Sequence, residues 1–406
     1  MSMPWWVALL YAATPEPLTF SQALEWSSDH PGPRAAAAEL EARREGDSKL
    51  SSFSHSPSVN LSPGWRASPE ADRGLEVIGG VQQSWNLGGL VNARREAARD
   101  ERAQLQLSLR AQQLEGRLEA ARAWLELWAL EREATLVERE LNVAKDQATR
   151  TERATKAGLF GADELAEAKS YVAETELAAL DVEGARFEET LRLSAALGRG
   201  SEQPACTAGV PPEVTLPTVD QRAALLARAE GMPIAQQGRL EALALKARVL
   251  EVEAENGATL STGVSLQRES PESWLVWLNL GLSVPLLERG QRGISEAQGA
   301  AAAAEVRSRS AHLGAQHTLA LAWHEVEHSL EQETALREHL LPELERLVAL
   351  RQRALESGEG TLLPLLVAQR RALQTERQLC RHEGRRRWSA VKLWLLLSQL
   401  SAEVRS

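Results

Sequence analysis

Arg153-Ala-Thr-Lys-Ala-Gly158 and Arg353-Ala-Leu-Glu-Ser-Gly358 are two versions of one segment, 200 residues apart. Residues beyond the two segments recur at the same spacing: Leu165 with Leu365, and Ala168 with Ala368. This period is far longer than the roughly 20 to 50 residues of solenoid and propeller repeats. The 406-residue chain is therefore predicted to be a duplication of one whole structural unit.

The duplication divides the chain into four parts. Residues 18–200 form the first predicted repeat and residues 218–403 the second. Residues 201–217 between them are rich in proline and turn residues, which indicates a linker. Residues 1–17 are interpreted as a weak signal peptide or a disordered N-terminus, because their short apolar stretch has no Lys or Arg before it.

Each repeat is predicted to begin with an interrupted helix. The first covers residues 19–46, opens with Thr19 as a cap and breaks at Pro31-Gly-Pro33. The second covers residues 218–256 and breaks at Gly231-Met-Pro233. Thr is a favoured N-cap residue, and Pro and Gly are the usual helix breakers.

Two strand-like runs follow the helix in each repeat. They are residues 58–66, 75–87, 260–267 and 274–284. In the last run one set of alternate positions is apolar: Trp274, Val276, Leu278, Leu280, Leu282 and Val284. Alternation over about ten residues indicates a strand with one apolar face, and it is also typical of a tilted membrane strand. Leu280 is central in the row, so we expect it near the middle of a bilayer.

Each repeat ends in a pair of very long helices. The first pair runs from Leu90 to Leu197 with a break at Gly158, and the second from Gln291 to Ser401 with a break at Gly358. Apolar residues step by four and three positions, as in Leu114, Leu118, Ala121, Leu125 and Trp128. This spacing is typical of coiled-coil packing. Pro342 interrupts the second pair and is predicted to bend it or mark a joint.

The predicted fold class is mainly α, with long antiparallel helical hairpins, four strands per chain and a two-fold internal repeat. Four strands cannot close a barrel, and lipid does not tolerate the open edges of a sheet. Helices of roughly 100 Å cannot cover their apolar stripes within one chain. Assembly of identical chains around one axis solves both problems. A dimer would supply eight strands and a trimer twelve, and these residues alone do not choose between them.

Composition excludes several function classes. The net charge of −10 argues against nucleic acid as a partner, because phosphate binding needs a cationic surface. Two cysteines, with no second Cys or His at metal spacing, exclude a disulfide framework and a zinc finger. No Ser/His/Asp or Cys/His constellation is present, so we predict no enzyme activity and no cofactor.

Three stretches carry a resemblance to a known family: Leu18-Thr-Phe-Ser-Gln-Ala-Leu24, Gln83-Ser-Trp-Asn-Leu-Gly-Gly89 and Val284-Pro-Leu-Leu-Glu-Arg-Gly290. With the duplicated order of parts, they make residues 18–403 similar to the outer membrane efflux proteins, the TolC-like channels. The resemblance implies a homotrimer with a 12-stranded barrel in outer-membrane lipid and an α-barrel in the periplasm. It also implies an exit duct for efflux or type I secretion, with a periplasmic adaptor and an inner-membrane pump as partners. The alternative is a soluble or periplasmic coiled-coil scaffold or adaptor.

The breaks between the long helices are the first candidate sites. By resemblance, Gly158, Leu159, Gly358 and Glu359 form the periplasmic tips that dock on the adaptor. Asp163, Glu164 and Glu359 lie close by, and three copies of each would form an acidic ring at the entrance that attracts cations. The alternative is that these acids are ordinary first-turn residues favoured by the helix dipole.

Tryptophans on or beside the strands are the second candidate site. Trp65, Trp85, Trp274 and Trp277 are interpreted as girdle residues at the two membrane interfaces. The alternative is core packing in a soluble sheet.

Two further motifs are predicted not to be functional sites. His324-Glu-Val-Glu-His328 matches HExxH, but Glu331 and Thr334 stand where a metzincin needs Gly and His. With His317 the pair could at most touch a transported metal ion weakly, so we predict no metal site. Arg385-Arg-Arg387 is interpreted as a solvated helix face.

Overall fold

The computed structural model describes residues 16–50, 53–66, 74–270, 273–287 and 289–401. The segment interpreted as a signal peptide or disordered tail lies outside the described residues, except for its last two. The chain divides into two compact units. The strand unit comprises Ala36–Leu109 and Pro233–Gly314, and the hairpin unit comprises Met1–Ala35, Arg110–Met232 and Ala315–Ser406. Both predicted repeats therefore contribute to each unit.

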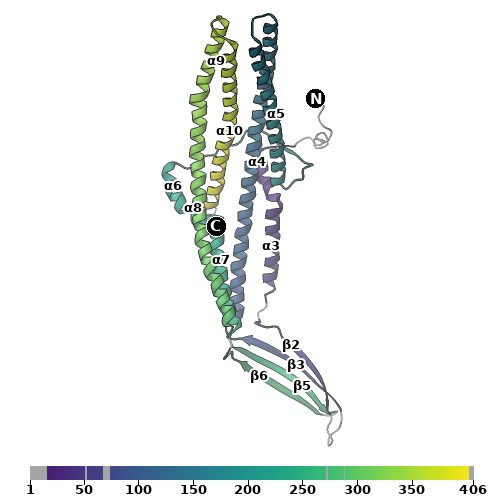
Figure 1. Cartoon of the computed structure of the whole chain (residues 1–406). Helices are drawn as coiled ribbons and strands as arrows, with labels where there is room; N and C mark the ends of the chain where they lie inside the picture. The colour runs from purple at the N-terminus through teal and green to yellow at the C-terminus, as the bar shows by residue number, and fades with distance from the viewer. Residues whose placement is uncertain (1–15, 51–52, 67–73, 271–272, 288, 402–406) are drawn as a thin grey trace. The chain divides into compact units, whose positions relative to one another are not determined.

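The strand unit contains one antiparallel sheet. Its strands are β2 (Ser58–Arg66), β3 (Gly74–Asn86), β5 (Thr259–Ser270) and β6 (Ser273–Ser283), in the order β2-β3-β5-β6. Figure 1 shows these four strands lying side by side. The central pair, β3 and β5, joins the two halves of the sequence, with Val81 opposite Val264. The four predicted strand runs are confirmed.

The helices that precede the strands are interrupted just before proline, close to the predicted breaks. The first predicted helix is divided into α2 (Phe20–Trp26) and α3 (Pro31–Ser48), and α3 begins with the Pro-Gly-Pro sequence. The second is divided into a short α6 (Arg222–Ala227) and α7 (Pro233–Glu255). Thr19 caps α2 in a capping box, since its Oγ1 accepts from the Gln22 N–H at 3.3 Å and its own N–H donates to Gln22 Oε1 at 2.9 Å.

Long helices make up most of the chain. They are α4 (Leu90–Lys156), α5 (Ala162–Ala196), α8 (Gln291–Thr334), α9 (Leu341–Glu356) and α10 (Leu362–Ser401). In the hairpin unit, α4 with α5 and α9 with α10 form two antiparallel pairs (Figure 1). The predicted mainly helical class with long hairpins is confirmed. No helix within the described ranges is long and apolar enough to span a membrane.

The joint predicted at Pro342 is a π-helical turn. Residues Ala335–Leu340 are π-helical between α8 and α9, and Pro342 lies at the start of α9. Proline has no N–H to donate to the preceding turn, and its ring collides with the carbonyl four residues earlier. A wider turn just before it relieves the collision without ending the helix.

The beginning of the described chain is held against the predicted linker. Strand β1 (Glu16–Leu18) pairs in parallel with β4 (Ala205–Thr207). The carbonyl of Leu18 accepts a hydrogen bond of 2.8 Å from Nε1 of Trp124, which is fully buried and packs edge-on against Phe20. The linker thus contains a short strand that fixes the N-terminal segment to α4.

The interior of the hairpin unit contains ion pairs as well as apolar side chains. Glu133 on α4 is fully buried and accepts hydrogen bonds from Arg377 and Arg381 on α10. The interpretation of Arg385-Arg-Arg387 as a solvated face is wrong for two of its residues. Arg386 pairs with the buried Glu333, and Arg387 donates to the Pro211 carbonyl at 3.1 Å and to Glu383 at 3.3 Å. Charge composition alone cannot show which carboxylates a distant helix presents.

Candidate functional site: the two-faced sheet and the hairpin turns

The four strands place apolar and polar side chains on opposite faces. Cross-strand partners share a face, so the register sorts every described residue of the sheet. The apolar face carries Val59, Leu61, Pro63, Trp65, Leu75, Val77, Gly79, Val81, Trp85, Leu260, Val264, Leu266, Trp274, Val276, Leu278, Leu280 and Leu282, together with Gln83, Thr262 and Arg268. The opposite face is mostly Gly, Ser, Asn and Gln. One face therefore suits hydrocarbon and the other suits water.

The register moves the centre of the apolar face by two residues from the sequence prediction. Leu278 lies in a row with Val264, Val81 and Val59, all aliphatic. Leu280 instead lies in a row with Thr262 and Gln83. Leu278 is 83% exposed, more than any other exposed large apolar residue of β6. The register therefore favours Leu278, rather than Leu280, as the central residue of the apolar face.

Three of the four candidate tryptophans lie on the apolar face at its two ends. Trp65 and Trp274 are near the turns that join β2 to β3 and β5 to β6. Trp85 is near the other end of the strands, next to the start of α4. Trp85 is level with Leu282, eight residues along β6 from Trp274. Eight residues at about 3.3 Å each give roughly 26 Å along the strand, or about 20 Å of height at a strand tilt of about 40°, which fits within the roughly 25 Å apolar band of a membrane barrel.

Trp277 does not belong to this belt. It is opposite Ser265 and is three residues from Trp274, so it lies on the polar face. Its assignment as a girdle residue is corrected. The odd spacing between the two tryptophans was already visible in the sequence.

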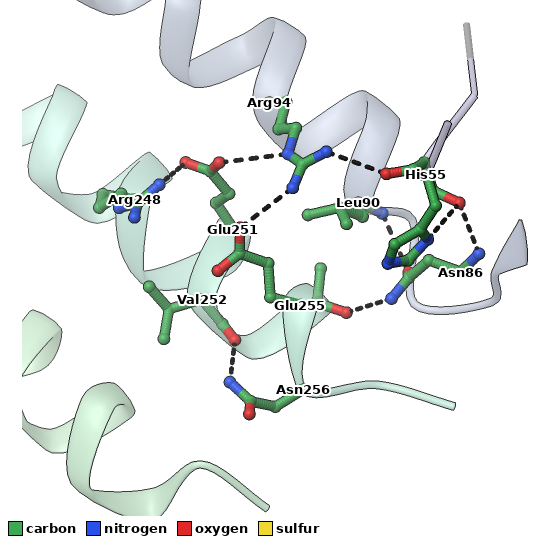
Figure 2. A network of polar contacts seen from close by, with 11 residues as sticks. His55, Asn86, Leu90, Arg94, Arg248, Glu251, Val252, Glu255 and Asn256 are labelled. Atoms are coloured by element: carbon green, nitrogen blue, oxygen red, sulfur yellow. Dashed lines mark hydrogen bonds and ion pairs between the residues drawn. The ribbon is translucent and has the colours of Figure 1, made fainter. Parts of the chain in front are cut away.

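The corner between strand and helix is organised by Asn86, the last residue of β3. Its Nδ2 donates to the Ala254 carbonyl at 2.6 Å, and its Oδ1 accepts from the Gly88 N–H at 2.8 Å. The same Oδ1 accepts from the Leu90 N–H at 3.3 Å (Figure 2). The side chain therefore satisfies the first free N–H of α4 and the last turn of α7 together. Gly89 follows with a φ of 78°, a conformation that favours glycine.

Arg94, one turn into α4, joins the same elements by charge. Its guanidinium lies 3.1 Å from Glu255 and 3.5 Å from Glu251 on α7, and it donates to the Ser54 carbonyl at 3.0 Å. Figure 2 shows Arg94 between these groups, with Arg248 on the outer side of Glu251. Neither Asn86 nor Arg94 was a candidate from sequence. The corner motif around Gly88-Gly89 was the available signal.

The two hairpin turns are built alike. Gly158 and Gly358 have φ values of 76° and 77°, and an added Cβ would meet nothing within 4 Å at either position. The Leu159 N–H donates a hydrogen bond of 2.9 Å to the Ala154 carbonyl, and the Glu359 N–H donates one of 3.0 Å to the Ala354 carbonyl. Both turns therefore close their helices in left-handed C-caps at the two predicted breaks. The Leu159 side chain is 76% exposed.

An apolar cluster holds the two turns together just inside their ends. Ala168 of α5 packs with Leu362 and Leu366 of α10. Partly buried side chains from both hairpins cover this cluster: Ala148, Phe160 and Leu355. The tips are therefore one surface, from which Leu159 projects.

The acidic candidates near the tips lie at helix beginnings. Asp163 and Glu164 are in the first turn of α5, and Glu164 Oε2 accepts from the Gly161 N–H at 3.0 Å. The capping alternative therefore describes Glu164. Asp163 and Glu359 have no such bond among the contacts described, and their part in an entrance ring stays a prediction.

The HExxH motif lies on α8. The His324 and His328 rings are stacked with centroids 5.7 Å apart, and Glu325 forms an ion pair with Lys392 at 2.8 Å. Within the described part of the chain, no three His, Cys, Asp or Glu side chains are grouped to hold a metal ion.

The sheet with one apolar face and the twin hairpins match a known family. A model of the outer membrane efflux proteins matches residues 28–199 and 223–399, one stretch in each predicted repeat. The chain belongs to the outer membrane efflux protein family. Its place is therefore the outer membrane, with the helical hairpins in the periplasm, and its function is efflux. The alternative of a soluble scaffold or adaptor is set aside.

Solved structures show that this outer membrane efflux protein shares its fold with several bacterial membrane proteins. A membrane protein from Pseudomonas aeruginosa has a TM-score of 0.79 at 17% identity, over 93% of each chain. The outer membrane protein VceC from Vibrio cholerae has a TM-score of 0.69 at 20% identity, over 94% of this chain and 95% of that one. The CmeC outer membrane channel from Campylobacter jejuni has a TM-score of 0.72 at 14% identity, over 95% and 88%. Among curated protein sequences, none matches the chain.

Proposed function

We propose that three copies of this chain form a passive duct that carries cargo from an inner-membrane pump through the periplasm and across the outer membrane. The observation that carries the proposal is the two-faced sheet, which has bare edges at β2 and β6. Its wide apolar face has no covering element among the described residues, and it is paired with a small, polar opposite face.

The edge strands β2 and β6 need partner strands outside the chain's own sheet. Edge N–H and C=O groups cannot be left unpaired in hydrocarbon, so β6 of one chain pairs with β2 of the next until the sheet closes. Two chains would give eight strands, and a barrel of that size is filled by its own side chains. Three chains give twelve strands. Twelve strands about 4.8 Å apart and tilted about 40° close into a cylinder of roughly 24 Å between opposite backbones. A trimer is the smaller assembly that leaves a water-filled duct.

Uncovered apolar positions on the helices fit the same assembly. They are Leu177 and Leu180 on α5, Leu313, Leu321 and Leu330 on α8, and Leu350 on α9. Spread along helices of this length, these positions suit contact with neighbouring copies rather than a compact partner.

The hairpin tips are the proposed contact with a periplasmic adaptor. Exposed Leu159, beside the turn at Gly158, offers an apolar knob, and the turn at Gly358 offers Glu359. We assign Asp163 and Glu359 to the entrance, where threefold copies would favour cations. The duct works by its pore and by docking, without covalent chemistry or a cofactor.

The test is extraction, assembly and conductance of the full-length protein. We expect it to fractionate with outer membranes and to need detergent for extraction. It should also run as a heat-modifiable trimer and form channels in planar bilayers. Recovery as a monomer in the aqueous fraction would contradict the duct. A detergent-extracted dimer would contradict the strand count but keep the membrane sheet.

A further inference from the structure

One large aromatic side chain stands on the polar face of the sheet. Trp277 of β6 is 51% exposed on a face that otherwise carries mostly Gly, Ser, Asn and Gln. The exposed half of this indole gains none of the burial that makes aromatic side chains useful to folding. Its exposure therefore needs another explanation.

Neighbours within the chain cannot cover the indole. The row across the sheet from Trp277 is Ser265, Gly80 and Asn60. An added Cβ at Gly80 would lie 2.8 Å from Ser265 Oγ and 2.7 Å from Asn60 Oδ1, so no larger side chain fits in this row. The adjacent row places Leu275 and Ile78 on the same face, on either side of Gln267.

The neighbouring copy in the proposed barrel offers the indole little cover. The strand that pairs with the unpaired edge of β6 is β2 of the next chain. On the polar face, the residues of β2 with described side chains are Ser58, Asn60, Ser62 and Gly64. Beside these four residues Trp277 meets only small side chains and stays exposed to the lumen.

We propose that Trp277, with Leu275 and Ile78, forms a threefold ring of aromatic and aliphatic contacts inside the barrel that binds lipophilic aromatic cations as they leave. The inference rests on the proposed trimeric duct. Three indoles at one level narrow a cylinder whose lining is otherwise mostly Gly, Ser, Asn and Gln. Trp277 is next to Leu278 along β6, so the ring lies near the middle of the barrel.

The charge of the cargo follows from the indole itself. The face of an indole carries a negative quadrupole potential that attracts cations. An aromatic anion would meet this potential unfavourably. A planar or globular aromatic cation satisfies the apolar and the electrostatic contacts together.

Single-channel recording with soluble blockers tests the proposal. Wild type, Trp277→Ser and Val276→Ala are compared in potassium chloride with tetraphenylphosphonium or a naphthalenesulfonate. Val276 is the adjacent residue on the opposite, lipid-facing side, so Val276→Ala is the matched control. We expect Trp277→Ser to conduct more than wild type and to be blocked by tetraphenylphosphonium about two- to thirty-fold more weakly, the range of a cation–π contact. Trp277→Phe should keep part of the block, which provides a second variant if the serine variant assembles poorly.

The outcomes separate this inference from the function on which it rests. Suppose that wild type and Val276→Ala form channels, and that Trp277→Ser and Trp277→Phe have the same conductance and block as wild type. This result would contradict the proposed ring and leave the proposed duct intact. Equal block by the naphthalenesulfonate and the phosphonium would overturn the cation preference. If no variant forms a channel, the duct is overturned and the ring with it.

Discussion

Leu278→Arg is the most direct test of how the sheet sits in lipid. Leu278 lies four residues from both Trp274 and Leu282, about 13 Å along the strand in each direction, so it occupies the middle of the apolar band. Arginine on the lipid face at the bilayer midplane costs about 2–4 kcal/mol. Three copies in one barrel would together cost about 6–12 kcal/mol, comparable to the whole stability of a typical domain. We expect assembly to fail.

The matched control is the next residue along the strand. Asn279 lies on the polar face, opposite Gly263, with its Nδ2 2.7 Å from Ser265 Oγ. Asn279→Arg adds the same charge in a position that faces water, so the trimer should form and its ion selectivity should shift toward anions. Leu280→Arg, one row nearer the helices and beside Thr262, should be intermediate.

The assay is heat-modifiable trimer on a gel, with denaturant titration of whatever trimer survives. Normal assembly of Leu278→Arg with failed assembly of Asn279→Arg would mean that the faces are inverted. Equal and normal assembly of both variants would refute the placement of β6 in lipid. Greater loss in Leu280→Arg than in Leu278→Arg would refute the midplane derived from the register.

Three further predictions concern the corner, the tips and the helical interior. Asn86→Ala removes the hydrogen bonds to Ala254, Gly88 and Leu90, so it should lower the free energy of unfolding by about 1–3 kcal/mol. The control Asn279→Ala should change this free energy much less, and thermal melting of the trimer measures the effect of each variant. Proline at position 158 or 358 cannot adopt the positive φ of the turn, so Gly158→Pro and Gly358→Pro should lower efflux while the trimer persists. Gly184→Ala, at a helical position with open space around it, is the control. Normal efflux by both proline variants at normal expression would contradict the docking assignment. Burial, reinforced by the charge of Glu126, raises the pKa of Glu189, so the folded protein favours the protonated carboxyl and loses stability as the pH rises through that pKa. Glu189→Gln should therefore have a higher melting temperature than wild type at pH 7 and a stability that depends less on pH. A lower melting temperature of the variant at pH 7 would contradict this.

Local patterns in the sequence determined the elements of this protein. The strands, the breaks at Pro31 and Pro233, the turns at Gly158 and Gly358 and the joint at Pro342 all follow from preferences of a few neighbouring residues. Side-chain alternation with period two also decides which residues share a face, because successive residues of a strand point to opposite sides. The position of Trp277 was therefore within reach of the sequence.

Only the tertiary structure decided which distant segments meet. The row of Leu278 with Val264, Val81 and Val59 depends on the relative register of strands nearly 200 residues apart, which no local preference records. The partners of Arg387 and the burial of Glu133 depend likewise on helix pairs far apart in the chain. Periodicity is a property of backbone dihedral angles within one segment, whereas register and charge pairing arise from contacts between segments. Those contacts are fixed only when the whole chain has folded.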